Sequence, residues 1–173
     1  MVDKALHSSN TDEWETPQHL FDFLNNDMPE PFTLDPCATP ENAKCKNYYT
    51  IEDDGLSKSW SGIVFVNPPY SSVDKWLAKA VYECRSTNEP ITIALLIGSR
   101  TDTTYWRDYI WTGPVWALTF IRGRLKFGNA TNSAPFPSCI VWMSSGVNTE
   151  GNMLIRPIVE VLDHDKKWNW YYL

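Results

Sequence analysis

The chain has 173 residues, of which 43% are hydrophobic and 21% are charged. This composition is typical of a soluble globular protein of about one domain, and it excludes a disordered tail. The net charge of −6 excludes the simplest kind of nucleic-acid-binding protein, one with a uniformly basic surface. The charge is uneven, however: residues 1–60 contain 12 acidic and 4 basic residues, whereas residues 61–150 contain 6 acidic and 8 basic ones. Such an asymmetry is a hint about partners, so the average charge alone does not describe the surface.

Several further classes are excluded by patterns that the chain lacks. No apolar run approaches the roughly 18–20 residues of a membrane-spanning helix, and the first residues carry no signal-peptide pattern. The cysteines show no CxxC pair and no histidine at ligand spacing, so we expect neither a zinc site nor a disulfide scaffold. We therefore expect a cytoplasmic protein that binds no membrane and no metal. The cysteines are Cys37, Cys45, Cys84 and Cys139.

Aromatic residues make up 14% of the chain and include nine tryptophans. Most of these side chains are expected to fill the core of a small domain. A few of them would instead form stacking surfaces for a planar ligand or for nucleic-acid bases. Only their positions in the fold can separate the two interpretations.

The hydrophobic pattern predicts helices and strands that alternate through the middle of the chain. Residues 1–12 are polar and are expected to be flexible. A helix is predicted over residues 18–26, with Thr16 as its N-cap and Pro17 in its first helical position. Further helices are predicted over residues 73–84, 103–111 and 153–162. Strands are predicted over residues 32–34, 48–51, 63–66, 91–97, 115–121, 138–143 and 168–173.

This order of elements predicts an α/β fold with a mostly parallel sheet and helices on both faces. The strand pair within residues 115–143 is expected to be antiparallel, because the long connection between its strands contains no helix. No internal repeat or low-complexity linker divides the chain. We therefore expect residues 1–173 to form a single domain.

The most informative motif is Asn67-Pro68-Pro69-Tyr70, which directly follows a predicted strand. Ligand sites of open α/β sheets lie beyond the carboxyl ends of the strands, so the motif occupies the expected place for catalysis. Its two prolines fix the backbone and remove two N–H donors. The carbonyl oxygens, the Asn67 amide and the Tyr70 ring that remain suit a planar substrate with an exocyclic amino group. The alternative is a structural Pro-Pro turn capped by Asn67.

This motif resembles the catalytic motif of S-adenosylmethionine-dependent amino-group methyltransferases, chiefly the N6-adenine DNA enzymes. Further motifs follow the order seen in the small phage-type Dam-like N6-adenine methyltransferases, and together they cover about residues 12–145. These motifs are Trp14-Glu15-Thr16-Pro17, Leu34-Asp35-Pro36-Cys37-Ala38, Glu41-Asn42-Ala43-Lys44-Cys45, Asp54-Gly55-Leu56 with Trp60, and Gly123-Arg124-Leu125-Lys126-Phe127-Gly128.

The resemblance implies a Rossmann-like class I methyltransferase fold without a separate target-recognition domain. It also implies the reaction: a methyl group moves from S-adenosylmethionine to N6 of an adenine that is flipped out of double-stranded DNA. Asn67 and Pro68 would accept the N6 hydrogens, Pro69 would stiffen the turn, and Tyr70 would stack on the base. This scheme requires neither a general base nor a metal.

The resemblance assigns a second group of residues to the cofactor. Asp35 would accept a hydrogen bond from the ammonium group of its methionine portion, and Asp54, beside Leu56, would accept one from the amino group of its adenine. The other matching positions lie in the N-terminal motif or in the loop after Asp35, which replaces a glycine-rich loop: Trp14, Thr16, Pro17, Pro36, Cys37 and Ala38. The acid for the ribose hydroxyls stays open among Glu41, Glu52 and Asp53.

DNA contacts are expected from basic residues that follow the catalytic turn. Arg122, Arg124 and Lys126 alternate along the sequence, which would place three cations on one side of a strand end. Arg100 follows another predicted strand and could reach a phosphate. The lysines at 44, 46, 166 and 167 are expected on a solvated face. The sequence specifies neither the recognition sequence nor the oligomeric state.

Three other functions remain open from the sequence. Related motifs serve N4-cytosine DNA methyltransferases and enzymes that methylate glutamine side chains in proteins, and all of these substrates present an amino group on a planar group. The third alternative is a non-catalytic DNA-binding relic that keeps the fold but has lost its cofactor affinity. The intact Asp35 and catalytic turn favour an enzyme.

Overall fold

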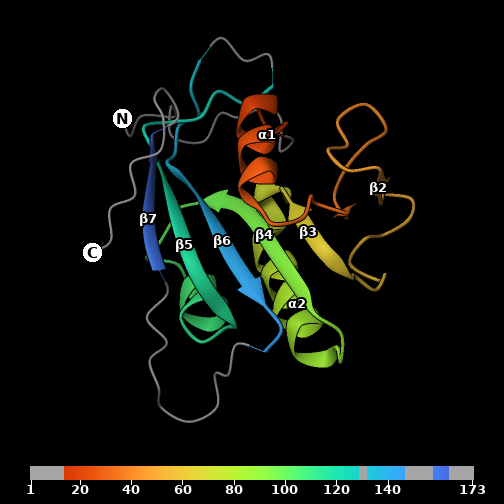
Figure 1. Cartoon of the computed structure of the whole chain (residues 1–173). Helices are drawn as coiled ribbons and strands as arrows, with labels where there is room; N and C mark the ends of the chain where they lie inside the picture. The colour runs from red at the N-terminus through yellow and green to blue at the C-terminus, as the bar shows by residue number, and fades with distance from the viewer. Residues whose placement is uncertain (1–13, 129–131, 147–157, 164–173) are drawn as a thin grey trace.

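The structure, a computed structural model, describes residues 14–128, 132–146 and 158–163. Within these residues, seven strands form one sheet in the order β2-β1-β3-β4-β6-β5-β7 (Figure 1). Only β6 runs antiparallel to its neighbours, and the other strand pairs are parallel. The strands are β1 (Leu34–Asp35), β2 (Asn47–Tyr48), β3 (Gly62–Val66), β4 (Ile91–Gly98), β5 (Val115–Arg122), β6 (Ser138–Ser144) and β7 (Ile158–Asp163), and the two α-helices are α1 (Gln18–Asp27) and α2 (Val73–Ser86).

The two α-helices cover opposite faces of the sheet (Figure 1). Successive side chains of a strand point to opposite faces. Phe65 of β3 and Leu96 of β4 accordingly pack in the cluster that contains α1, whereas Val66 and Leu95 pack in the cluster that contains α2. Because β3 and β4 are buried on both faces, they appear in the sequence as continuous apolar runs, which made them easy to predict.

The predicted α/β fold with an antiparallel pair near its end is confirmed. β6 lies between β4 and β5, and Ser138 at its start pairs with Gly98 at the carboxyl end of β4. The connection over residues 123–137 therefore returns to the sheet at the edge where the parallel strands end. This is the edge where α/β folds bind their ligands.

The predicted helix over residues 153–162 is wrong, because β7 occupies residues 158–163. This strand pairs in parallel with β5, from Ala117 opposite Ile158 to Arg122 opposite Asp163. A short apolar run does not distinguish a strand from a helix by its periodicity, and the free edge of β5 supplies the hydrogen bonds that decide for a strand. The edge strand predicted over residues 168–173 lies outside the described residues, as do residues 1–12.

Smaller elements also differ from the prediction. The helix predicted over residues 103–111 is a single π-helical turn, Trp106–Ile110, which is closed by a hydrogen bond from the Trp111 N–H to the Trp106 carbonyl at 2.9 Å. The strands predicted at residues 32–34 and 48–51 are the two-residue strands β1 and β2, each displaced by one or two residues. Thr16 does not cap α1: Pro17 stands at the N-cap, and no side chain caps the helix.

The positions of the tryptophans confirm the expected core role for several of them. Trp60, Trp76, Trp106 and Trp142 are buried in the core, and Trp111 is 54% exposed.

In the described part of the chain, no helix is long and apolar enough to cross a membrane. Over the same residues, no three His, Cys, Asp or Glu side chains gather as a possible metal site.

Candidate active site

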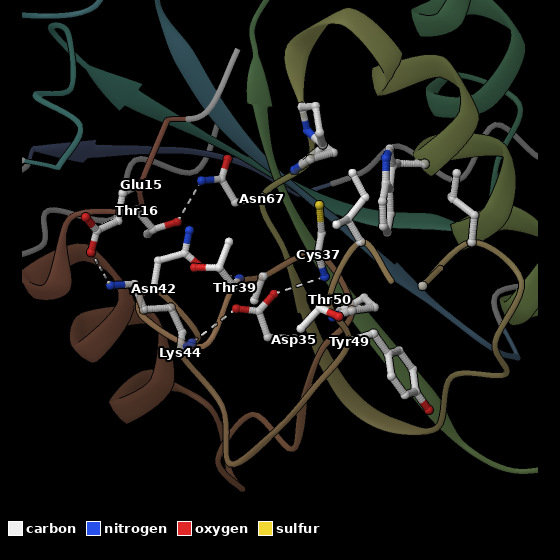
Figure 2. Close-up of a pocket in the computed structure, with 18 of the residues that line it drawn as sticks. Glu15, Thr16, Asp35, Cys37, Thr39, Asn42, Lys44, Tyr49, Thr50 and Asn67 are labelled. Carbon is white, nitrogen blue, oxygen red and sulfur yellow. Dashed lines mark hydrogen bonds and ion pairs between the residues drawn. The ribbon is translucent and has the colours of Figure 1, made fainter. Parts of the chain in front are cut away.

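A cavity of about 490 Å³ opens at the carboxyl ends of β1 and β3 (Figure 2). Its size lies within the usual range for small-molecule sites, about 300–1,000 Å³. Residues predicted for the cofactor line it together with the start of the catalytic turn: Trp14, Thr16, Asp35, Pro36, Cys37, Ala38, Asp54, Leu56, Asn67, Pro68 and Pro69. Two of the predicted catalytic and cofactor residues do not line it: Pro17 is buried at the start of α1, and Tyr70 packs against the cores on both faces of the sheet.

Asp35 is the last residue of β1 and is only 4% exposed. Its Oδ1 accepts a hydrogen bond from the Cys37 backbone N–H at 3.3 Å, and its Oδ2 accepts one from that of Lys44 at 3.1 Å. Burial nevertheless raises the pKa of this carboxyl to about 6, although both hydrogen bonds and the nearby Lys44 charge act against the shift. An ionised carboxylate in this position is stabilised by a bound cation.

The turn that carries Asp54 closes one side of the cavity. Asp54 has a φ of +54°, a left-handed conformation that Asp tolerates better than most residues. A Cβ on Gly55 would come within 2.0 Å of the Pro36 carbonyl oxygen, so only glycine permits this close approach to the loop after β1. The Trp60 indole N–H donates to the Gly55 carbonyl at 2.9 Å and fixes the turn from the core side.

The three acids left open for the ribose lie in different environments. Glu52 lines the cavity, whereas Glu41 and Asp53 do not. Asp53 instead accepts hydrogen bonds at 2.9 Å from both the backbone N–H and the hydroxyl of Thr50. These bonds hold the pKa of Asp53 below its usual value. Position therefore favours Glu52 among the three.

Asn67 follows β3, and the N-terminal segment holds its amide. Nδ2 donates to the Thr16 hydroxyl at 3.0 Å and to the Trp14 carbonyl oxygen (Figure 2). Because a carbonyl can only accept, the Trp14 contact determines that the NH₂ group faces residues 14–16. Asn67 Oδ1 is buried and has no hydrogen-bond partner among the described residues. Leaving a buried acceptor without a donor lowers the stability of a protein by about 1–3 kcal/mol. The amino group of a substrate would supply the missing donor.

Tyr70 begins a 3₁₀ turn (Tyr70–Ser72) and lies among aromatic rings. Its ring centroid is 4.7 Å from that of Phe136 and 6.3 Å from that of Phe127, and the Trp14 ring contacts both phenylalanines. The Tyr70 hydroxyl is buried beside that of Ser138. Burial raises the pKa of Tyr70, so the phenol stays neutral. We call Trp14, Tyr70, Phe127 and Phe136 the aromatic cluster.

The basic residues predicted to contact DNA are exposed, but they do not share one strand. Arg122 ends β5, and the chain then turns at Gly123, which has a φ of +82°. Arg124 and Lys126 follow in an irregular segment and project to solvent, whereas Leu125 and Phe127 between them are buried. The Arg100 guanidinium lies 5.9 Å from the centroid of the Phe136 ring, at the edge of the aromatic cluster.

The sequence analysis missed part of the cavity wall. Lys44 was expected on a solvated face, yet its side chain is only 7% exposed and lines the cavity. Glu15, Tyr49 and Thr50 line it as well. Lys44 and Glu15 belong to motifs on which the resemblance rests, so their signal was present, but no chemical role had been given to either residue.

Comparisons with known proteins bear on what this arrangement does. A family model described as "DNA N-6-adenine-methyltransferase (Dam)" matches residues 3–155, most of the chain. The chain belongs to this Dam family. The match includes the cavity, the catalytic turn and the basic segment that follows β5.

Individual relatives agree with the family. The chain is 31% identical over 102 residues to "DNA N-6-adenine-methyltransferase" of Haemophilus phage HP1, which covers 58% of this chain and 59% of the relative. It is 42% identical over 66 residues to "Putative methyltransferase YfdM" of Escherichia coli K12, a match that covers 34% of this chain and 71% of the relative. It is 28% identical over 99 residues to "DNA N-6-adenine-methyltransferase" of Escherichia phage T1, a match that covers 56% of this chain and 40% of the relative. The chain thus matches only part of each relative's length.

Proposed function

We propose that this Dam family member transfers a methyl group from S-adenosylmethionine to N6 of an adenine in double-stranded DNA. The observation that carries the proposal is the state of Asn67, whose NH₂ group is held by Trp14 and Thr16 while its buried Oδ1 lacks a partner among the described residues. An exocyclic amino group is a donor that fits this acceptor. The family match and the two phage relatives support adenine as the base that presents it.

The cavity fits the proposed methyl donor in size and in charge. S-adenosylmethionine supplies an electrophilic methyl group on a sulfonium centre. Asp35 offers a carboxylate for its ammonium group, Glu52 lies where ribose hydroxyls could be bound, and Leu56 and Asp54 flank the part of the cavity proposed for its adenine. Nearly all cofactor residues expected from the sequence therefore surround one space, which supports their proposed roles.

The catalytic turn would act by position and by charge. Asn67 Oδ1 and the Pro68 carbonyl oxygen would each accept one N6 hydrogen and so direct the nitrogen lone pair at the methyl group. Both oxygens would also stabilise the positive charge that develops on N6 during transfer. Such a site needs no general base among its residues, because the loss of a proton can follow the transfer.

The adenine has to leave the duplex to reach this turn, which costs a few kcal/mol. Stacking on Tyr70 would offset part of this cost. In the structure, however, Phe136 covers the Tyr70 ring at a centroid distance of 4.7 Å. The two rings must therefore separate before a base can stack, whereas the cofactor cavity is already open.

The surface around the aromatic cluster fits a polyanion. Arg100, Arg122, Arg124 and Lys126 are exposed at or after the strand ends that carry the site. Since the whole chain carries a charge of −6, DNA binding would depend on this face and would be sensitive to salt. We place the reaction in the cytoplasm, where bacterial DNA and the methyl donor are both present.

Methylation of random-sequence DNA by the full chain, read by modification-sensitive sequencing, tests the proposal. We expect N6-methyladenine within a defined short sequence, with label also entering cytosine-free but not adenine-free oligonucleotides. Label in adenine-free DNA would indicate an N4-cytosine enzyme, and label only in added protein would indicate a glutamine methyltransferase. A chain that shows no calorimetric binding of S-adenosylmethionine would be a non-catalytic relic. Each of these three results contradicts the proposed function.

A further inference from the structure

Lys44 lies in the cavity wall, where a positive charge is costly unless it has partners. Its Nζ donates to Glu15 Oε1 at 3.4 Å (Figure 2). It also donates to Gln18 Oε1 at 3.1 Å. The backbone of Lys44 is anchored to β1, because its N–H donates a hydrogen bond to the Asp35 carboxylate. Lys44 is therefore held at the cavity by its backbone and by its side chain.

These contacts do not saturate the ammonium group. It has three N–H donors, and the two contacts within the described residues use two of them. The Glu15 contact of 3.4 Å is longer than a charge-assisted hydrogen bond of about 2.7–2.9 Å. The Glu15 side chain is also 44% exposed, so solvent screens its charge. Lys44 thus keeps a donor and much of its positive charge for an anion in the cavity.

The cavity wall carries both a cation and an anion. Asp35 and Lys44 line the same space, the Lys44 backbone N–H donates to Asp35 Oδ2 at 3.1 Å, and the Lys44 charge is near enough to act against the raised pKa of Asp35. An α-amino acid carries an ammonium group and a carboxylate on one carbon atom. A neighbouring carboxylate and ammonium group in the protein are complementary to that pair.

We propose that Lys44 binds the carboxylate of the methionine portion of the methyl donor, while Asp35 binds its ammonium group. This inference rests on the proposed use of S-adenosylmethionine and adds the residue that recognises its acidic end. Glu15 and Gln18 hold the Lys44 side chain in place, and the ligand carboxylate takes the donor that they leave. The 41–45 motif thereby gains a chemical role.

Calorimetric titration at pH 7.5 with two ligands tests this role. The ligands are S-adenosylmethionine and decarboxylated S-adenosylmethionine, which keeps the amine and the sulfonium but has no carboxylate. We expect the wild-type chain to bind S-adenosylmethionine about 10- to 100-fold more tightly than the decarboxylated compound, the usual effect of one charge-assisted hydrogen bond. Lys44→Met is expected to abolish this preference and to leave binding of the decarboxylated compound within about threefold of wild type.

Lys46→Met is the matched control, because Lys46 is two residues away, exposed and outside the cavity. It should leave both dissociation constants unchanged. Equal binding of the two ligands by the wild-type chain overturns the inference without any variant, which keeps the test decisive if Lys44→Met does not fold. Equal losses for both ligands in Lys44→Met overturn it as well. A wild-type chain that binds neither ligand overturns the proposed function itself, an outcome distinct from the other two.

Discussion

The two ends of the turn at residues 67–70 lie in contrasting surroundings. Asn67, Pro68 and Pro69 border an open cavity, whereas Tyr70 is packed against Phe136 and Phe127. On the first side, polar atoms are held ready, including an acceptor without a donor among the described residues. On the second side, apolar rings fill the space that a base would need. Under the proposed function, the first is the cofactor side, which is formed in advance, and the second is the base side, which forms only when the substrate arrives.

One segment connects the two sides. Residues 14–16 hold the Asn67 amide, line the cavity and contribute the Trp14 ring to the aromatic cluster. The Glu15 carbonyl also accepts a hydrogen bond from the Gly128 N–H at 2.8 Å, which ties the segment after the basic residues to the same place. Changes in this segment are therefore expected to affect both cofactor binding and catalysis.

The largest expected effect follows from removing the acceptor that both sides share. Asn67→Ala should lower the rate of methyl transfer by about 10²- to 10³-fold, because it removes one of the two oxygens proposed to orient N6 and to stabilise its developing charge. Binding of S-adenosylmethionine, measured by calorimetry, should change by less than about fivefold, since this residue does not contact the charged end of the ligand. Asn88→Ala, at an exposed position after α2, is the control. Near-normal turnover by Asn67→Ala would remove this turn from the mechanism.

Tyr70 tests the base side alone. Tyr70→Ala should lower kcat/KM for DNA by about 10- to 100-fold, in line with the 1–3 kcal/mol measured for base stacking, and should leave cofactor affinity unchanged. Tyr70→Phe should retain activity, because the proposed stacking uses only the face of the ring. Steady-state kinetics with DNA as the varied substrate provide the measurement. A large loss in Tyr70→Phe would show that the hydroxyl, and not the ring face, is the functional group.

Acid should weaken the cofactor side selectively. The pKa of Asp35 is raised to about 6 by burial, so its carboxylate is ionised at pH 7 and mostly protonated at pH 5. Since the ligand ammonium group needs the ionised form, affinity for S-adenosylmethionine should fall about tenfold from pH 7 to pH 5 and reach a plateau above pH 7. Calorimetric titrations across this range measure the effect. Asp35→Asn should bind S-adenosylmethionine weakly, with an affinity that does not change between pH 7 and pH 5. If the affinity of this variant still falls with acid, a group other than Asp35 titrates.

Substitutions of Thr16 test whether its hydrogen bond to the Asn67 amide matters for methyl transfer. Thr16→Val keeps the shape of the side chain but removes one of the two acceptors for Asn67 Nδ2. Single-turnover methyl transfer should slow by about tenfold, the effect of one lost hydrogen bond, while Thr16→Ser should restore most of the rate. If the valine and serine variants are equally slow, packing rather than the hydroxyl explains the loss.

The smallest effect is expected at the rim of the base side. Arg124→Glu should weaken DNA binding several-fold at low salt and should reduce the slope of log affinity against log salt by about one or two. Lys58→Glu, an exposed change in the segment that ends before β3, should leave the slope unchanged. Fluorescence anisotropy over a series of salt concentrations separates the two outcomes. An unchanged slope for Arg124→Glu would exclude it from the phosphate contacts.

Long-range pairing explains where the sequence-based fold prediction succeeded and where it did not. β3, β4 and α2 carry strong periodic or continuous apolar patterns, and their predicted ranges agree with the structure within one or two residues at each end. β7 carries only a short apolar pattern, and its type depends on the edge of β5, which lies 36 or more residues earlier in the chain. The single-domain prediction for residues 1–173 stays a prediction.

The sequence by itself determined the fold class, the family and a set of cofactor residues nearly all of which line the cavity, because these are properties of local patterns and of motif order. Only the tertiary structure decided three further points: which way the Asn67 amide faces, that Tyr70 is covered by Phe136, and that Lys44 is withdrawn from solvent. Each depends on contacts between residues 26 to 66 positions apart, such as the bond from Asn67 to Thr16. Hydrogen-bond direction and burial arise only when such segments meet, so no local pattern encodes them.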